Sequence, residues 1–313
     1  MGMENTATRD EADRFAPDEV ALRPREVYFE WDKSPLHWIP GDPYGSHVIT
    51  ALNLLLPTAE RWFSKLLSDA LEYVRDEHLR EEIIGFIGQE SVHAQTHDRV
   101  LVEYLARRGI DPQPFLDQLE WVAGQYDQRI SKATPQNKRK ALASGTHALC
   151  AAEHFTGVFG HWALNNSWDQ LNVDPTLCDL YRWHATEEVE HRHVSYNVAK
   201  YFGMDYVAQA AAGALVSLAF FAIMFRGTKF LVHADPTLPN LGYFRIYMKM
   251  RASGKRGGVP KTGYVVRAAM RMFRRDYHPL NEGNTAQAVA YLATSPAARA
   301  LHDRAPHDRA PHD

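Results

Sequence analysis

Cysteine is scarce in this sequence: 313 residues contain only Cys150 and Cys178. Two thiols exclude a disulfide scaffold and a thiolate zinc site, and they suit a reducing compartment. Residues 1–21 are charged and lack an apolar core, so they do not have the pattern of a secretory signal. We therefore expect a cytoplasmic protein.

The sequence also lacks an excess of charge of one sign and any run of alternating β-branched residues. Its 35 Lys and Arg face 38 Asp and Glu, a formal net charge of -3, so no basic field indicates a nucleic-acid partner. Hydrophobic residues make up 45% of the chain, enough for a sizeable core. Because they recur at three- and four-residue spacing, we predict an all-α fold.

Histidine is the residue in excess, with 16 copies. Three of them, His302, His307 and His312, fall in a low-complexity tail over residues 302–313. The other 13 histidines lie in the body of the chain, where a cluster of them would indicate a functional site.

We predict four regions along the chain. Residues 1–44 are rich in proline and form an extended N-terminal arm, anchored by Tyr28, Phe29, Trp31 and Trp38. Residues 45–204 form a helical bundle, 205–301 additional helices packed on it, and 302–313 the tail. Pro57 should kink or divide the first bundle helix. The predicted helical segments are 45–76, 78–108, 113–132, 135–164 and 175–203.

For two stretches beyond the bundle, the sequence allows more than one environment. Residues 206–225 carry no charge, so they form either a buried or dimer-forming helix, which we favour, or a helix that contacts or spans a membrane. Residues 245–275 contain ten Lys and Arg and no acid. This basic stretch is either a solvated face with a glycine-rich mobile loop, which we favour, or a surface for anionic lipid.

Two of the predicted helices carry the pair Glu-x-x-His. Glu90 and His93 leave one face of the second helix, and Glu188 and His191 repeat the spacing on the last. His184 precedes Glu188 by one turn on the same stripe. Each pair can reach one metal ion, and the combination is far more specific than either pair alone.

The other two long helices supply one glutamate each among apolar neighbours, Glu60 and Glu153. A dinuclear carboxylate centre in a four-helix bundle uses one Glu from each of two helices and Glu-x-x-His from the other two. We therefore predict a centre for two metal ions. Its seven predicted ligands are Glu60, Glu90, His93, Glu153, His184, Glu188 and His191.

Simpler interpretations stay open for single residues. Glu60 could pair with Arg61, Glu153 with His147 or His154, and the Glu-x-x-His pairs could be solvated helix faces. Glu187 or Glu190 could replace Glu188 as a ligand. We interpret the remaining histidines near the predicted ligands as supporting or core residues, with His97 the nearest to being a ligand itself. The residues predicted to support the ligands are His97, His147, His154 and Glu187.

These residues resemble the ferritin-like dimetal-carboxylate superfamily. Ile87-Gly88-Gln89-Glu90-x-x-His93 and Trp183-His184-x-x-Glu187-Glu188-x-Glu190-His191 are similar to a bacterial family of predicted metal-dependent hydrolases. With His184 added, the ligand pattern also looks like that of di-iron arylamine N-oxygenases acting on p-aminobenzoate. The resemblance covers about residues 28–280 and implies a ferritin-like bundle with a dimetal centre.

From this pattern we expect a non-haem di-iron oxygenase or oxidase with dioxygen as co-substrate. The carboxylate and imidazole ligands suit iron or manganese better than structural zinc, and zinc stays an alternative. The substrate would be a small organic molecule of lipophilic character, and the electron donor a ferredoxin or reductase. A dimetal hydrolase using a metal-bound water is the main alternative, and a ferritin-like metal-binding protein without catalysis is the second. Peripheral membrane contact and a homodimer are left open.

Overall fold

The structure is a computed structural model that describes residues 21–30 and 33–304. Every regular element in these two ranges is a helix and none is a strand, which confirms the all-α class. Trp31, His307 and His312 lie outside the described residues. The α-helices are α2 (Pro43–Leu71), α3 (Glu77–Ala106), α4 (Gln113–Ser131), α5 (Pro135–Leu164), α6 (Pro175–His191), α7 (Val194–Tyr201), α8 (Tyr206–Ala234), α9 (Tyr243–Arg256), α10 (Thr262–Arg271), α11 (Thr285–Leu292) and α12 (Pro296–Arg304).

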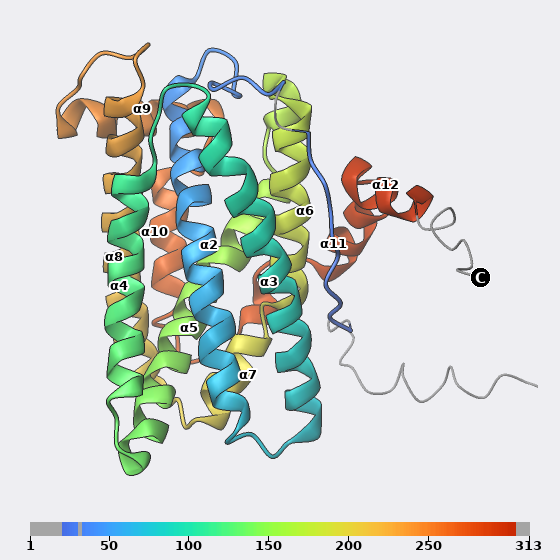
Figure 1. Ribbon diagram of the computed structural model, residues 1–313, viewed down its shortest axis with the longest axis vertical. Coiled ribbons are helices and arrows are strands. Elements are labelled where there is room, and N and C mark those ends of the chain that lie inside the picture. The colour runs from blue at the N-terminus through green and yellow to red at the C-terminus, as the bar shows by residue number, and fades with distance from the viewer. Residues whose placement is uncertain (1–20, 31–32, 305–313) are drawn as a thin grey trace, which may run out of the picture.

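Four long helices, α2, α3, α5 and α6, form the bundle (Figure 1). Helices α2 and α3 are antiparallel neighbours, and α5 and α6 form the second antiparallel pair. Helix α4 runs along the outside and returns the chain from the end of α3 to the start of α5. One long crossover between two helical hairpins is the connectivity of ferritin-like bundles.

Local sequence signals set most helix ends. The side chains of Asp42, Asp76 and Asp174 accept hydrogen bonds from backbone N–H groups of the first turns of α2, α3 and α6. Each such cap contributes about 1 kcal/mol. Of the two expectations for Pro57, division of the first helix is wrong, because α2 continues through it, and a kink stays a prediction. The predicted segment 175–203 is instead broken after His191, where α6 ends.

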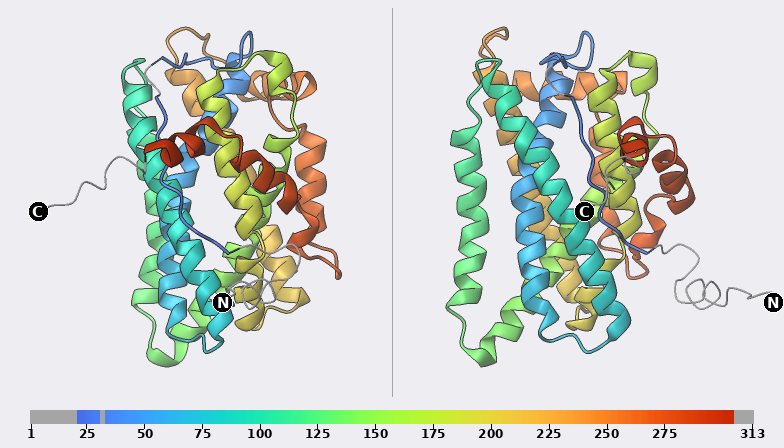
Figure 2. Two further views of the ribbon diagram at one scale, coloured as in Figure 1. Left: turned by 90° about the vertical axis from the view of Figure 1, so that its right-hand side faces the viewer. Right: turned by 45° about the vertical axis from the view of Figure 1, so that its right-hand side comes forward.

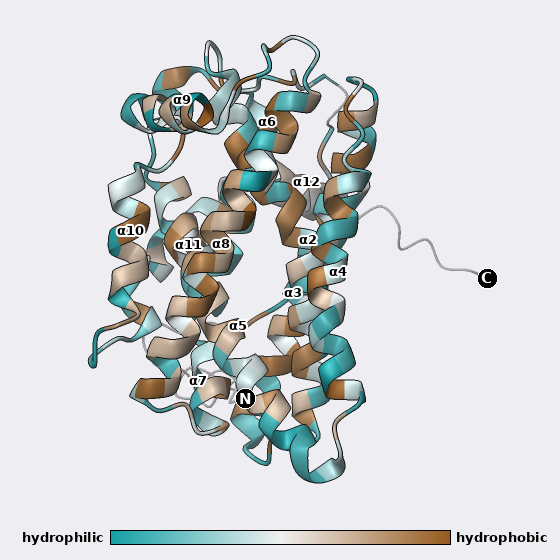
Figure 3. Ribbon diagram, turned by 90° about the vertical axis from the view of Figure 1, so that its left-hand side faces the viewer, coloured by the Kyte–Doolittle hydropathy of each residue, from teal (hydrophilic) through white to brown (hydrophobic). Residues whose placement is uncertain are grey.

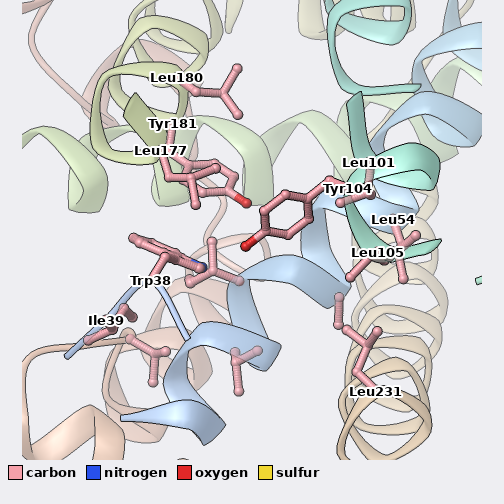
Figure 4. Packing of buried hydrophobic residues seen from close by; sticks show 14 of the residues in the cluster. Trp38, Ile39, Leu54, Leu101, Tyr104, Leu105, Leu177, Leu180, Tyr181 and Leu231 are labelled. Atoms are coloured by element: carbon pink, nitrogen blue, oxygen red, sulfur yellow. The ribbon is translucent and has the colours of Figure 1, made fainter. Parts of the chain in front are cut away.

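Two apolar cores stack along the bundle and leave a polar layer between them. One core contains Leu54 and Leu101, and Trp38 of the arm packs there against Tyr181 of α6 (Figure 4). The other contains Phe63 and Phe86. On α2 and α3 the sequence passes from one core to the other through the predicted ligands. The predicted ligands of α2 and α3 therefore lie between the two apolar cores.

The arm runs as an extended segment along α3 and α6 (Figures 1 and 2). It fits closely because α3 has glycine where the arm crosses: a Cβ on Gly85 would lie 2.6 Å from the Cβ of Leu22. Phe29 is buried and packs against Trp183 of α6 at 6.0 Å between ring centroids. Tyr28, another predicted anchor, is exposed instead. The arm is thus placed to deliver residues to the polar layer.

Helices beyond the bundle cover its remaining sides. Helix α8 packs lengthwise on α2 and α5, and α11 lies across α6 (Figure 2). Helix α8 is long and apolar enough to cross a membrane. Of its most apolar 18-residue stretch, only 22% is buried within the chain. The favoured expectation of a buried helix is therefore wrong for the single chain: one face of α8 packs and the other is exposed.

The basic stretch 245–275 is mostly helical, so the expected mobile loop is also wrong. Helices α9 and α10 occupy most of it, and a short turn over residues 257–261 joins them. Gly257 ends α9 in the left-handed conformation, φ +88°, where glycine is favoured. The glycines of this stretch therefore end and pack helices.

Candidate metal centre

All seven predicted ligands meet in the polar layer. They come from the middle of α2, α3, α5 and α6, and none is more than 6% exposed. Their nitrogen and oxygen atoms form overlapping groups in which every atom lies within 4.8 Å of the others. Buried ionisable groups at this density need partners or a cation. The residues concerned are Glu60, Glu90, His93, Glu153, His184, Glu188 and His191.

One group of ligand atoms centres on His191. Its Nε2 lies 3.2 Å from Glu90 Oε1, 3.3 Å from Glu153 Oε2 and 3.3 Å from Glu188 Oε2. Three carboxylates and one imidazole nitrogen therefore converge from three helices. This set can hold one metal ion.

The other group centres on His93 and His184. The Oε1 atom of Glu188 lies 3.0 Å from His184 Nε2 and 3.4 Å from His93 Nδ1, while Glu60 Oε1 lies 3.9 Å from His184 Nε2. His184 thus lies with Glu60 and His93, apart from Glu153. His184 precedes Glu188 by one turn of α6, whereas His191 follows Glu188 by nearly one turn, so the two histidines lie in different groups.

Two carboxylates belong to both groups. Glu188 presents one oxygen to each, and Glu90 lies within ligand distance of Glu60 and His93 as well as of His191. In a dinuclear carboxylate centre, such shared carboxylates can bridge the two ions. These are the glutamates of the two Glu-x-x-His pairs.

The outward nitrogen of His93 is held by a buried ion pair. His93 Nε2 lies 2.9 Å from Glu187 Oε2, and the other oxygen of Glu187 accepts a hydrogen bond from Arg25 Nη1 at 2.9 Å. This contact leaves His93 Nδ1 facing the carboxylates. Carboxylate partners of this kind orient a metal-binding imidazole and raise its basicity.

His191 is held through an amide. Its Nδ1 lies 3.2 Å from Gln89 Oε1, and Gln89 Nε2 donates to Glu190 Oε2 at 3.1 Å. Glu190 in turn accepts two hydrogen bonds from Arg25, at 2.7 and 3.0 Å. Since Gln89 presents its oxygen, Nδ1 donates to it and Nε2 is the ring nitrogen that faces the carboxylates.

His184 is supported by a second histidine. His97 Nε2 and His184 Nδ1 are 2.9 Å apart, and both rings are buried. Burial, followed by the neighbouring His184, holds the pKa of His97 well below its usual value, so this ring stays neutral. His97 also lies within ligand distance of Glu60, so its position allows it either to support His184 or to bind a metal ion itself.

Three carboxylates of the layer have no hydrogen-bond partner for either oxygen in the part of the chain that the structure describes. Both oxygens of Glu60, Glu90 and Glu153 are buried without a hydrogen-bond partner among the described residues. Burial, and then repulsion by Glu90, raises the pKa of Glu60 well above its usual value. Burial, and then Glu188, raises the pKa of Glu153 to about 8. Burial therefore disfavours the charged forms of Glu60 and Glu153.

The pKa of Glu188 and that of its neighbour His191 shift in the complementary direction. Burial alone would raise the pKa of Glu188, but His191 and His184 outweigh it and hold that pKa well below its usual value. Burial likewise would lower the pKa of His191, and the surrounding carboxylates, Glu188 foremost, raise it instead. The carboxylates thus favour the protonated form of His93 and His191, whereas burial, and then the neighbouring His93, lowers the pKa of His184.

This donor set fits two divalent ions. Four carboxylates neutralise a charge of four, and three imidazoles complete the positions without any thiolate. Oxygen and imidazole nitrogen ligands suit iron, manganese or zinc, and do not choose among them. The unpartnered oxygens of Glu60, Glu90 and Glu153 are the observation that a metal would satisfy.

Two predicted supporting residues lie elsewhere. His154 directs Nε2 to the carbonyl of Ala268 at 2.8 Å and Nδ1 to the hydroxyl of Tyr277 at 3.1 Å. His147 is half-buried, and the charged group that acts on it is Asp205. Neither histidine supports a ligand, because both leave α5 on faces turned away from Glu153.

Arg25, Gln89 and Glu190 are the supporting residues that we did not predict. Gln89 directly precedes Glu90, and Glu187 with Glu190 repeats the three-residue spacing of the ligands, so α3 and α6 carried a signal. No sequence signal marked Arg25 as a supporting residue, because it lies 162 residues before Glu187 in the chain.

An apolar cleft of about 320 Å³ reaches the centre from the side of α4 and α8. His184 and Glu188 stand in its wall, beside Thr58 of α2 and Thr156 of α5. Nearly all of its other lining is apolar. Its volume is that of a small-molecule pocket. Apolar and aromatic lining residues include Leu52, Leu56, Trp62, Phe155, Phe159 and Phe220.

A separate trio of potential ligands lies near the start of α2. His37 Nε2 and His47 Nε2 each lie 2.7 Å from Asp235 Oδ2. The other oxygen of Asp235 accepts hydrogen bonds from Thr237. These contacts tie the arm, α2 and the end of α8 together.

The family of predicted metal-dependent hydrolases matches residues 23–283 by its sequence model, so the chain belongs to this family. The match spans the arm from Arg23, the whole bundle, and helices α8 to α10. A search of curated proteins and one of solved structures found no match. Membership agrees with the resemblance of the Glu-x-x-His segments, and it favours hydrolysis over the oxygenase activity that we expected first.

Proposed function

We propose that the chain is a dimetal-dependent hydrolase acting on a lipophilic ester or related acyl substrate. The observation that carries this proposal is the set of buried, unpartnered oxygens on Glu60, Glu90 and Glu153, next to a cleft with an apolar lining. Membership of the metal-dependent hydrolase family supports the reaction type.

The protein's own residues would hold two ions in fixed positions. His93 Nδ1, His184 Nε2 and His191 Nε2 face the carboxylates, because hydrogen bonds to Glu187, His97 and Gln89 fix their outward nitrogens. Bound divalent ions would lower the pKa of a coordinated water and polarise a carbonyl group.

The cleft would select and orient the substrate. Its apolar lining excludes water and favours a hydrocarbon chain, and Thr58, Thr156, His184 and Glu188 are among the polar side chains in its wall. The reacting carbonyl would therefore be placed against His184 and Glu188. Burying about four methylenes contributes about 3 kcal/mol, so longer acyl chains should bind more tightly.

Metal analysis and ester hydrolysis test this proposal together. Protein reconstituted with zinc or manganese should hold two ions per chain and hydrolyse p-nitrophenyl esters under argon, with kcat/KM rising as the acyl chain lengthens. Glu90→Ala with His191→Ala should abolish metal binding and activity. Glu103→Ala with His161→Ala, a matched pair outside the centre, should retain both. Absence of hydrolysis by fully loaded protein with every ester would refute the proposal.

A di-iron oxygenase or oxidase is the second candidate, and the donor set favours it. Four glutamates with two Glu-x-x-His pairs are the ligands of ferritin-like di-iron and di-manganese proteins. This function would require iron, dioxygen and an electron donor such as a ferredoxin or reductase. Oxygen uptake by the chemically reduced iron protein, coupled to oxidation of a lipophilic substrate, would support it. Full hydrolytic activity with zinc under argon would exclude it.

A further inference from the structure

Helix α8 presents an exposed apolar stripe to the surroundings. Val207, Leu215 and Leu218 are 72%, 68% and 72% exposed, and Ala211 and Ala222 continue the row at three- and four-residue spacing. No charged residue interrupts the sequence between Tyr206 and Phe225. A surface of this kind on a folded chain marks an interaction site.

Helices α9 and α10 extend the same face (Figure 3). On α9, Ile246 is buried while Phe244 is 74% exposed and Met248 is exposed beside it. On α10, Val266 and Met270 are exposed in the same manner. We define the docking face as the exposed residues of α8, α9 and α10, of which the large apolar ones are Tyr206, Val207, Leu215, Leu218, Phe221, Tyr243, Phe244, Tyr247, Met248, Val266 and Met270.

The docking face is strongly basic as well as apolar. Between residues 236 and 275 the chain has ten Lys and Arg and no acid. Some are paired, for instance Arg271 with Glu282 and Arg274 with Asp276. The exposed cations interleave with the apolar side chains. They include Arg245, Lys249, Arg251, Lys255, Lys261 and Arg267.

We propose that the docking face binds the surface of an anionic lipid bilayer. Apolar side chains interleaved with Lys and Arg are the pattern of helices that lie in a membrane interface, and each cation near such a surface contributes about 1 kcal/mol. The neighbouring helix α4 carries exposed Asp117 and Glu120, so it would form the rim that stays in water.

Charge complementarity selects a bilayer over a second copy of the chain. A twofold dimer through this face would bring the same patch of each copy together, and therefore its cations against their equivalents. An anionic lipid surface neutralises them instead.

Packing of the opposite face of α8 shows that this helix would lie on the membrane without crossing it. A Cβ on Gly227 would lie 2.8 Å from the ring of Phe115, and one on Gly213 would lie 3.0 Å from Met272. Thr228 is fully buried as well. Lipid cannot surround a helix that is packed this closely on the bundle.

The apolar interior is continuous with the docking face. A second cleft of about 340 Å³ lies among α2, α8, α9 and α10, and Phe221 and Tyr247 line it. It shares Leu52, Phe159 and Phe220 with the cleft at the metal centre. A lipophilic substrate, which rests on the proposed function, could therefore pass from the bilayer to the centre.

Vesicle binding by the full chain tests the docking face without using substrate. Sedimentation with vesicles of phosphatidylcholine and phosphatidylserine should show binding at least about tenfold stronger than with phosphatidylcholine alone, weakened by salt. Leu215→Glu with Leu218→Glu should lose at least about tenfold in partitioning. Ile84→Glu, an equally drastic change at a residue of α3 that is 58% exposed, should not.

Three outcomes would overturn the proposal. The first is equal or absent binding to both vesicle types, and the second is unchanged binding by the double variant. The third is a stable dimer in light scattering that the double variant dissociates, with no vesicle binding by wild type. Circular dichroism and metal content of the double variant verify its fold. Because no substrate is present, failure here leaves the proposed hydrolase activity standing.

Discussion

The α3–α6 side of the metal centre and the α2–α5 side hold their ligands differently. On α3 and α6, the imidazoles of His93, His184 and His191 each have an outward nitrogen fixed by a buried partner. On α2 and α5, the carboxylates of Glu60 and Glu153 have no hydrogen-bond partner among the described residues. The protein therefore fixes the three imidazoles, whereas the carboxylates of Glu60 and Glu153, like that of Glu90 on α3, have oxygens left for a cation.

This difference assigns separate tasks to the two sides. A supported imidazole keeps its position and tautomer whether or not metal is present. An unpartnered buried carboxylate destabilises the metal-free fold and stabilises the loaded one, because its desolvation is offset only when a cation arrives. The cleft reaches the centre at His184 and Glu188 of α6, and none of the residues that fix the imidazoles, Glu187, His97 and Gln89, is among its lining residues.

Removing charge on the α2–α5 side should give the largest effect. Glu60→Gln should lower the metal content of the reconstituted protein from two ions per chain to one or fewer. The same change should raise the free energy of unfolding of the metal-free protein by about 1–3 kcal/mol, because it removes a charge whose burial is uncompensated. Metal analysis and urea unfolding measure the two quantities.

Glu103→Gln provides the control, because Glu103 is an exposed residue of α3. It should change neither quantity. Two retained ions in Glu60→Gln, or a metal-free protein that becomes less stable, would show that Glu60 is held by the protein and that the two sides do not differ.

Breaking the support on the α3–α6 side should have the next largest effect. Arg25→Ala leaves Glu187 and Glu190 buried without their cation, which should destabilise the fold by about 3 kcal/mol. Loss of orientation at His93 and His191 should weaken metal binding about 10- to 100-fold. Competition with a chromophoric chelator measures this affinity.

Arg23→Ala is the matched control for Arg25→Ala, since Arg23 lies two residues away in the arm with an exposed side chain. Its metal affinity and stability should equal those of the wild type. Unchanged metal affinity in Arg25→Ala would mean that the α3–α6 side needs no support from the arm.

The smallest effect concerns a histidine outside the centre. Burial holds the pKa of His154 below its usual value of about 6.5, so the fold favours the neutral ring. The resulting stability is complete above pH 6.5 and is lost as the pH falls toward the lower folded value. Between pH 7.5 and 5.0 the metal-free wild type should lose about 1 kcal/mol more than His154→Gln. Equal losses would contradict a neutral, buried His154.

Much of this molecule was accessible from residue spacing. Helix periodicity predicted the all-α class, and two Glu-x-x-His pairs with Glu60 and Glu153 predicted residues that the structure does bring together in one layer. Such predictions succeed because a three-residue interval on a helix fixes a common face, whatever surrounds it. The predicted starts of segments 78–108, 113–132, 135–164 and 175–203 likewise lie within one residue of the starts of α3, α4, α5 and α6.

Other features depend on long-range packing. The rotation of the helices against one another decides three of these features. It places His184 with Glu60 and His93, it turns His154 toward Tyr277, and it leaves one face of α8 exposed. The supporting role of Arg25 depends on where an extended arm crosses α3 and α6.

The sequence by itself therefore determined the helical class, the helix starts and the set of acids and imidazoles that share helical faces, because these depend on intervals of a few residues. Only the tertiary structure decided how the ligands divide into two groups, which of them the protein supports, and which apolar face of α8 stays uncovered. Those features depend on contacts between segments far apart in the chain, and no local pattern encodes them.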